Sequence, residues 1–174
     1  MAETPKTVRS TSDRLLSMVE TVSGNSDDAG IRAAARLLHD FNVEYDEPVP
    51  PPHVLATRLS RLVEDEQITV LLARADEDGS AVGVAVMRVQ PSILSFAQEV
   101  YLAELYVEPG RRGQGFGREL MTEAMRIARE RGAEYAFLIT SEDDHLAQRL
   151  YEAAGFRRTE GEGGPLMLAY EREL

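Results

Sequence analysis

Ten residues of the chain, R-R-G-Q-G-F-G-R-E-L from Arg111 to Leu120, combine three glycines with three arginines. They follow a strand-like run that ends at Val107 and lead into a helical pattern over Gln114–Arg131. The first turn of a helix has unpaired backbone N–H groups and favours negative charge. Glycines let a ligand approach the backbone closely, and arginines add positive charge. These residues therefore predict a phosphate or pyrophosphate site.

Spacing separates the nucleotide-binding motifs that this loop could represent. The mononucleotide pattern G-x-x-x-x-G-K-[ST] fits Gly110 and Gly115, but F-G follows where lysine and a hydroxyl are required. The dinucleotide fingerprint G-x-G-x-x-G fits Gly113 and Gly115, but Arg118 stands at its third glycine. An NAD-dependent oxidoreductase would need that glycine and a larger substrate domain, so the spacing disfavours both readings.

A third pattern, R/Q-x-x-G-x-G/A, is satisfied by Arg112, Gly115 and Gly117. It resembles the pyrophosphate-binding signature of the GNAT superfamily, the acyl-CoA-dependent N-acyltransferases. The preceding A-E-L-Y-V-E-P resembles the central strand of that family, and the later H-L-A-Q-R-L-Y-E-A-A-G-F resembles its second cofactor motif, A-x-x-L-Y-x-x-x-G-F. The specific resemblance spans Tyr101 to Phe156.

The resemblance implies that acetyl-CoA, or another acyl-CoA, binds in a cleft where the strands Glu99–Val107 and Tyr135–Thr140 splay apart. Loop amides would receive the pyrophosphate, and a strand-edge N–H would face the thioester oxygen, where such a donor stabilises the transition state by about 3 kcal/mol. The implied cofactor-binding residues are Leu105, Tyr106, Val107, Arg112, Gly113, Gln114, Gly115, Phe116, Gly117, Arg118, Asp144, Ala147 and Tyr151. Asp144 departs from the asparagine common in the family, and an ionised carboxylate cannot donate a hydrogen bond to the cofactor.

Amine attack on a thioester requires an ammonium group to lose its proton first. Glu104 is the first candidate to accept it through a water, because similar enzymes often place an acid in the strand that approaches the reacting carbon. A bulge could change the face that Glu104 occupies, so Glu99, Glu142 and Glu44 remain alternatives.

Tyr151 is the candidate acid that protonates the departing thiolate. It follows Ala147 by four residues, so the two lie on one helical face, and the small alanine leaves room for the cofactor. Phe116 is expected in the core and contributes only its backbone amide.

The acceptor pocket is expected to involve the segment between the first two helices, residues 41–53. Its acidic residues favour a cationic amine, either a small molecule or a peptide. The residues expected to bind the acceptor are Asn42, Glu44, Tyr45 and Glu142.

Composition narrows the function classes. The 174 residues contain no cysteine, which excludes disulfides, thiolate metal sites and a cysteine nucleophile. The three histidines lack metal-ligand spacing, so no metal is expected. A net charge of −11 argues against sequence-independent nucleic-acid binding and suits a cationic substrate. The start of the chain lacks an apolar secretion segment and no apolar run could span a bilayer, so we expect a cytoplasmic protein without a membrane partner.

Periodicity predicts one α/β domain over residues 15–174, preceded by a polar tail over residues 1–14. The expected strands are Leu15–Val22, Ile68–Ala75, Ala81–Gln90, Glu99–Val107, Tyr135–Thr140, Phe156–Thr159 and Leu166–Glu171. The first of these segments, Leu15–Val22, could also be helical. The expected helices are Ala29–Phe41, a second one that carries Leu55, Leu59, Leu62 and Val63, Gln114–Arg131 and His145–Ala154. The apolar Tyr135–Thr140 suits a covered, central strand.

By resemblance the fold is a single GNAT-like domain with a central mixed, mostly antiparallel sheet, a splay between two strands and helices on both faces. A homodimer is compatible with the resemblance. The expected activity is acetyl transfer from acetyl-CoA to a primary amine by direct attack in a ternary complex. The alternative is a non-catalytic acyl-CoA-binding sensor or partner module of the same fold, which Glu104 and Tyr151 disfavour.

Overall fold

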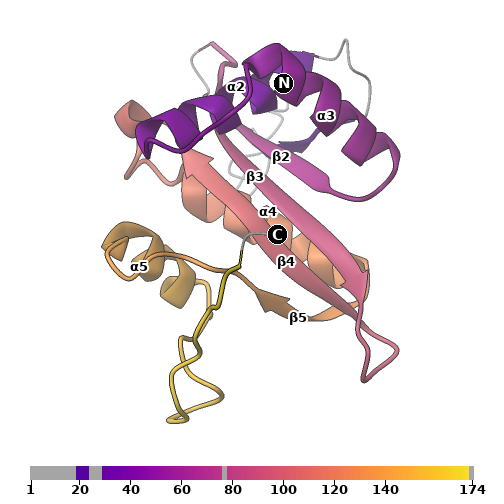
Figure 1. The fold of residues 1–174 in the computed structure, drawn as a ribbon, viewed down its shortest axis with the longest axis vertical. Helices are drawn as coiled ribbons and strands as arrows, with labels where there is room; N and C mark the ends of the chain where they lie inside the picture. The colour runs from indigo at the N-terminus through magenta and orange to yellow at the C-terminus, as the bar shows by residue number, and fades with distance from the viewer. Residues whose placement is uncertain (1–18, 24–28, 76–77, 173–174) are drawn as a thin grey trace, which may run out of the picture.

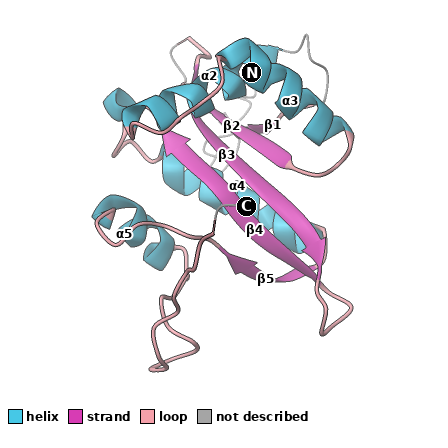
Figure 2. Ribbon diagram, in the orientation of Figure 1, coloured by secondary structure: helices cyan, strands magenta, loops and turns pink. Residues whose placement is uncertain are grey.

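The structure is a computed structural model that describes residues 19–23, 29–75 and 78–172. Its strands form one sheet in the order β1-β2-β3-β4-β5 (Figure 2). The strands are β1 (Val19–Thr21), β2 (Thr69–Arg74), β3 (Ala81–Pro91), β4 (Gln98–Val107) and β5 (Ala133–Phe137). The first three pairings are antiparallel and the β4–β5 pairing is parallel, which confirms the mixed, mostly antiparallel sheet.

Helices cover both faces of the sheet. They are α2 (Ala29–Glu44), α3 (Pro52–Glu64), α4 (Phe116–Glu130) and α5 (His145–Ala153), with a short 3-10 turn, η1 (Pro109–Arg111), before α4. Figure 1 shows α2 and α3 over one face of the sheet and α4 behind the other face. None of the described helices is long and apolar enough to cross a membrane.

Two apolar clusters hold these layers together. The α2–α3 core includes Ile31, Leu37, Leu59, Val70, Val84 and Tyr106. The α4 core includes Leu71, Val82, Met87, Leu102, Leu120 and Met121. Because both faces of β2 and β3 are covered, these strands are almost continuously apolar and buried, as the sequence V-L-L-A and A-V-G-V-A-V-M requires.

Helix α2 is longer than the sequence predicts. The predicted end at Phe41 is wrong, because the helix continues to Glu44. The side-chain amide of Asn42 donates to the carbonyl of Leu38 at 2.8 Å and so contributes to the last turn. Two of the expected acceptor-binding residues, Asn42 and Glu44, therefore lie on a helix rather than in a loop.

The C-terminal third differs most from expectation. The strand predicted over Tyr135–Thr140 begins two residues earlier as β5 and ends at Phe137. Within the described part of the chain β5 is the last strand of the sheet, and it is only partly covered, so a covered central position is wrong. Neither closing strand forms, and one isolated bridge between Thr159 and Leu166 stands in their place. Short apolar segments carry β propensity, but a strand also needs a paired neighbour.

Some of the predicted segments lie partly or wholly outside the described residues. Residues 1–14 and the Leu15–Met18 part of the first expected strand lie outside the described residues, as do residues 76–77 of the predicted β2–β3 turn. The described part of that turn confirms turn chemistry, because the Ser80 N–H donates to Oδ1 of Asp78 at 2.9 Å.

Candidate active site

The glycine loop runs from η1 into the first turn of α4. Gly113 and Gly115 have φ values of 77° and 104°, a region that side chains other than glycine rarely adopt. Gly115 is the N-cap of α4, so the amides of Phe116, Gly117 and Arg118 form the first turn, where no intrahelical acceptor exists. The loop thus presents a row of N–H groups at a positive helix end, as an anion site requires.

Gly117 has a packing role that its motif does not reveal. A Cβ atom at this position would lie 3.3 Å from Cδ2 of Leu150 in α5 and 3.8 Å from Cγ2 of Val107 in β4. By contrast, a Cβ at Gly113 would meet nothing within 4 Å. The last glycine of the pattern therefore lets α4 approach α5 and β4, whereas the earlier glycines shape the backbone.

The side chain of Arg112 fastens the loop to α2. Its Nη2 donates to both carboxylate oxygens of Glu44, at 2.7 and 2.8 Å, and its Nε donates to the Val107 carbonyl at 3.0 Å. The guanidinium also lies over the Tyr106 ring, 5.7 Å from its centroid. Burial, the Glu44 charge and a hydrogen bond with Glu44 together raise the pKa of Tyr106 to about 12, against the opposing effect of Arg112.

The expected splay lies between β4 and β5. Their parallel pairing runs from Gln98–Ala133 to Tyr101–Phe137, whereas β4 continues to Val107. Alternate residues of a strand direct their backbone groups to opposite neighbours. The Glu108 N–H donates to Val82 of β3 and the Val107 carbonyl accepts from Arg112, so the backbone groups of Val107 and Leu105 face the open edge. Either N–H suits a thioester oxygen.

A β-bulge determines where Glu104 points. Met87 of β3 pairs with Leu102, but the next residue, Val86, pairs with Glu104, so Ala103 is an extra residue in β4. One inserted residue reverses the alternation of side chains that follow it.

The packing on either side of the bulge shows this reversal. Leu102 lies in the α4 core before the bulge, and Leu105 packs against the same core after it. Tyr106 lies in the α2–α3 core, so Glu104 shares the α2–α3 face of the sheet. This is the face on which residues 41–53 lie, and the question that the sequence left open is thereby resolved.

Burial raises the pKa of Glu104 above its ordinary value, and the nearby positive charge of Arg88 partly opposes that shift. The carboxyl group is only partly accessible to solvent. A carboxylate with a raised pKa holds a proton more strongly, which is the property that a general base requires.

Tyr151 extends from α5 against the α4 core, where its ring meets Phe156 edge-on at 6.3 Å. Burial, with smaller contributions from the charges of Asp144 and Glu104 and from the phenol of Tyr45, raises the pKa of Tyr151 to about 12. The phenol therefore stays protonated at neutral pH, as a proton donor must. Glu104 of β4 and Tyr45, which directly follows α2, both affect the pKa of Tyr151 on α5. The fold therefore brings the expected base and the expected acid into one region.

Asp144 is the N-cap of α5. Its Oδ1 accepts the Ala147 N–H at 3.0 Å, so an aspartate performs here the capping role that asparagine could also perform. The loop before it is held by Gln148, whose amide donates to the carbonyls of Ser141 and Glu142 at 2.9 and 2.7 Å. The Glu142 side chain is exposed.

Three aromatic rings contact one another where the acceptor-binding segment, residues 41–53, approaches the glycine loop. Phe41 stacks on Tyr106 at 5.2 Å and meets Tyr45 edge-on at 5.3 Å. Tyr45 is 53% exposed, and its pKa is raised, first by burial and then by the charge of Asp144 on α5. Tyr45 therefore faces the α5 side of the site, whereas the Asn42 amide is bound to its own helix.

Sequence reasoning missed one contributor and offered one alternative base that lies elsewhere. Arg88 was not singled out, because the bulge that turns Glu104 to the face of Arg88 is not visible in the sequence. Glu99 pairs with Gln90 near the start of β4, on the far side of the bulge.

A cavity of about 410 Å³, lined partly by Thr69 and Arg131, lies at the opposite end of α4 from the glycine loop.

The sequence profile of the Acetyltransferase (GNAT) family matches residues 34–156, which run from α2 to the residue after the α5 stop. The chain belongs to the GNAT family. It is accordingly an acyltransferase with the mixed-sheet fold of that family. A solved structure from Arthrobacter sp. FB24, provisionally assigned as an acetyltransferase, is 34% identical, with a TM-score of 0.78 over 99% of this chain and 100% of that one.

Two further relatives share a lower sequence identity with this chain. The D-amino-acid N-acetyltransferase HPA3 of Saccharomyces cerevisiae is 28% identical over 114 residues, which cover 65% of this chain and 71% of the yeast protein. An aminoglycoside acetyltransferase, meta-AAC0020 from an uncultured soil metagenomic sample, has a TM-score of 0.71 at 18% identity, over 90% of this chain and 95% of that one, and so is similar in fold.

Proposed function

We propose that this GNAT enzyme transfers the acetyl group of acetyl-CoA to a primary amine by direct attack in a ternary complex. The observation that carries the proposal is the bulge at Ala103. It turns Glu104 to the face of the acceptor segment, near Tyr151 and beside the strand edge that β5 leaves open.

The residues of the loop fit a pyrophosphate. Two glycines with positive φ and the first-turn amides of α4 offer N–H groups to its oxygens, and Arg111 and Arg118 add positive charge. A Cβ atom added at Gly113 would meet nothing within 4 Å, and one added at Gly115 would meet only the side chains of Glu119 and Arg118. Acetyl-CoA supplies the acetyl group and a thiolate leaving group when bound.

The chain's own groups would then act in sequence. Glu104 accepts a proton from the ammonium form of the acceptor, through a water, and leaves a neutral amine. The amine nitrogen forms a bond to the acetyl carbon as the carbon–sulfur bond breaks. The Leu105 or Val107 N–H stabilises the negative charge on the carbonyl oxygen, and Tyr151 donates its proton to the thiolate. The second proton that the amine nitrogen then loses passes through water to the Tyr151 phenolate and restores the phenol.

A cationic amine is the acceptor that the charges favour. The carboxylates of Glu104 and Asp144 lie on the acceptor side, and the neutral phenol of Tyr45 adds a hydrogen-bonding group there, in a chain with a net charge of −11. Small-molecule and peptide amines share this chemistry. The D-amino-acid and aminoglycoside substrates named for two relatives belong to those proteins, and both contain the amine that the proposal requires.

The test begins with ligand binding. Thermal unfolding is measured with acetyl-CoA, NADH and ATP in parallel, and a ligand at about a hundred times its dissociation constant stabilises by roughly 2.7 kcal/mol. We expect a shift with acetyl-CoA alone. A shift with NADH or ATP alone would refute the proposed donor site.

An amine panel then tests the acceptor, with release of free CoA as the readout. Each cationic amine is matched with a neutral analogue of the same size. We expect turnover with members of the cationic set and little with the neutral set. Acetyl-CoA binding without turnover on either set would favour the acyl-CoA-binding sensor.

A further inference from the structure

Arg88 of β3 is an exposed cation beside Glu104, the proposed base. It pairs with Tyr101 of β4, whereas Glu104 pairs with Val86, two residues earlier in β3. Val86 lies in the α2–α3 core and Met87 in the α4 core, so alternation places Arg88 on the α2–α3 face together with Glu104. Diagonal neighbours on one face of a sheet lie about 7–8 Å apart, a distance that long side chains can bridge.

The ring of Tyr101 orients the Arg88 guanidinium without using its N–H groups. The central carbon of the guanidinium lies 5.9 Å from the ring centroid, in a cation–π contact. Over the described ranges 19–23, 29–75 and 78–172, the Arg88 side chain forms no hydrogen bond or ion pair. A guanidinium carries a planar fork of N–H donors that matches a carboxylate. Arg88 is therefore a positioned cation with unused donors next to the group that accepts the proton.

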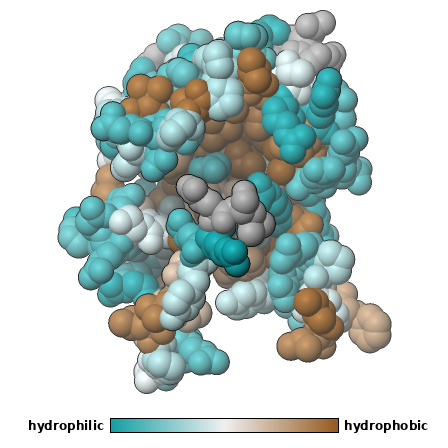
Figure 3. All heavy atoms as spheres, viewed as in Figure 1, coloured by the Kyte–Doolittle hydropathy of each residue, from teal (hydrophilic) through white to brown (hydrophobic). Residues whose placement is uncertain are grey.

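Aromatic side chains continue this face across β4 and β5. Phe137 of β5 pairs with Tyr101 and stacks on its ring at 5.1 Å, and Tyr135 stacks on Phe137 at 6.1 Å. The three rings belong to neither apolar core of the described chain, and Tyr135 is 54% exposed. Figure 3 views the molecule from this side of the sheet, with α2 and α3 at the top and mostly polar side chains (teal) across its middle. The rings thus offer apolar contacts to a ligand on an otherwise polar face.

Opposite charges alternate along this part of β4. Glu99 pairs with Gln90, so Glu99 and Glu104 lie on either side of Tyr101, and Arg88 stands opposite the interval between them. An ammonium group near Glu104 and a carboxylate at Arg88 would each meet an opposite charge. A second ammonium group on the acceptor would instead be repelled by Arg88. The pattern therefore favours a zwitterion over a polycation.

We propose that the acceptor is an α-amino acid with an apolar side chain, and that Arg88 binds its carboxylate. The inference rests on the proposed function, since it names the amine that the site acetylates. The ammonium group lies toward Glu104, and the apolar side chain contacts the rings of Tyr101 and Phe137. The nitrogen bonds to the acetyl carbon as the carbon–sulfur bond breaks, and the products are an N-acetyl amino acid and CoA.

The test compares acceptors that differ only in the carboxylate. The L and D forms of phenylalanine and leucine are assayed with acetyl-CoA by release of free CoA. Their amides, which stand for a peptide N-terminus, and the amines 2-phenylethylamine and 3-methylbutylamine are assayed in parallel. Each acceptor is measured with the wild type, with Arg88→Gln and with the control Arg129→Gln, an exposed arginine on α4.

We expect kcat/KM for at least one of the amino acids to exceed that of its amide and of its amine by about 10- to 100-fold, because hydrogen bonds between charged groups are the strong ones. The ratio should persist in Arg129→Gln and fall to near one in Arg88→Gln. Loss of Arg88 also removes a charge that lowers the pKa of Glu104, but this acts on every acceptor and leaves the ratio unchanged. Faster turnover of the amides or amines by the wild type, or an unchanged ratio in Arg88→Gln, would overturn the inference.

Binding separates this inference from the proposed function. Calorimetric titration measures the affinity of the same amino acids for the wild type and for Arg88→Gln, each with CoA present. Acetylation that shows no preference for the carboxylate would leave the proposed function intact and refute the inference. Amino-acid binding that depends on Arg88 but leads to no acetylation would refute acetyl transfer and support the carboxylate site. Neither binding nor turnover of the amino acids would overturn the inference.

Discussion

Replacement of Glu44 by glutamine tests the link between α2 and the glycine loop. Glu44 accepts from Arg112 through both oxygens, and the two side chains are 28% and 31% exposed. Buried charge-assisted hydrogen bonds contribute about 1.5–3 kcal/mol, whereas exposed ion pairs contribute about 0.2–1 kcal/mol. For a partly exposed bidentate pair we expect Glu44→Gln to lower the free energy of unfolding by about 1 kcal/mol, or about 2–4 °C in Tm.

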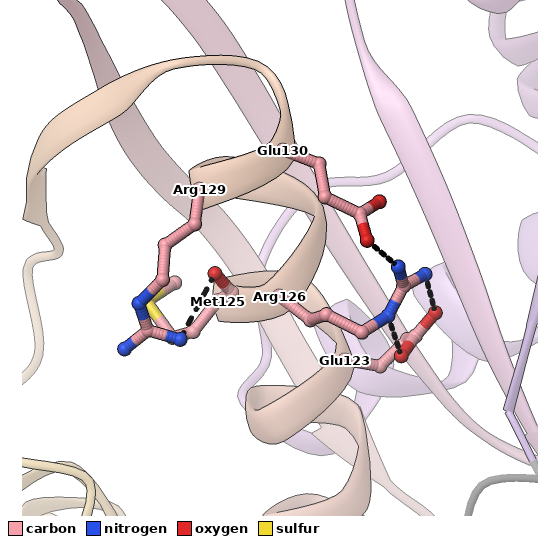
Figure 4. A network of polar contacts seen from close by, with 5 residues as sticks. All are labelled: Glu123, Met125, Arg126, Arg129 and Glu130. Carbon is pink, nitrogen blue, oxygen red and sulfur yellow. Dashed lines mark hydrogen bonds and ion pairs between the residues drawn. The ribbon is translucent and has the colours of Figure 1, made fainter.

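A matched control lies on α4. Figure 4 shows Arg126 between Glu123 and Glu130 on an exposed helix surface, within a single element. Glu130→Gln should leave Tm unchanged, because such surface pairs contribute little. Thermal unfolding of both variants is measured with and without acetyl-CoA, and only Glu44→Gln should also weaken binding. Equal Tm values for the two variants, or unaltered binding in Glu44→Gln, would refute the assigned role of the link.

Three further substitutions test the site. Tyr151→Phe should lower turnover by about 10² or more while acetyl-CoA binding is retained, and unchanged turnover in a CoA-release assay would remove its role as acid. Burial raises the pKa of Glu104, so wild-type kcat/KM should fall on acidification at a pH above 4.5, a step that Glu104→Gln should lack. The raised pKa also means that the folded state binds this proton more tightly than the unfolded state. The free energy of unfolding of the wild type should therefore decline, relative to that of Glu104→Gln, as pH rises from 4.5 through the raised pKa. A difference between the two proteins that does not change with pH would contradict this. Gly115→Ala and Gly161→Ala, at φ values of 104° and 66°, should each destabilise by about 1–2 kcal/mol, but calorimetric titration should find weaker acetyl-CoA binding in Gly115→Ala alone.

Features encoded by neighbouring residues could be predicted from the sequence. The loop and the start of α4 follow from glycine spacing and helical periodicity, and the family follows from motifs within Tyr101–Phe156. The bounds of β2, β3 and β4 were predicted to within one residue for the same reason, because apolar runs bounded by turn residues are local signals.

Features that depend on distant partners could not be predicted. The face of Glu104 depends on how β4 pairs with β3. The end of α2 was missed for a different reason, because the bond from the Asn42 amide to the Leu38 carbonyl is local but apolar periodicity does not show it. The apolar composition of Tyr135–Thr140 suggested cover on both sides, but composition does not specify a neighbouring strand. The same limit applies to Leu166–Glu171, whose apolar residues indicate a strand without indicating its partner.

Because Ala103 is an extra residue in β4, the number of residues in this strand determines which face the site side chains occupy. The pairing of β4 with β5 ends at Tyr101, just before this residue, and after it every side chain of β4 lies on the opposite face from the one that strict alternation would give. Point substitutions in this strand can be tolerated singly, but removal of one residue would shift Glu104 and Tyr106 to the α4 side together. An engineered acceptor preference is therefore better sought by substitutions on α2 and α5 than by an insertion or deletion in β4.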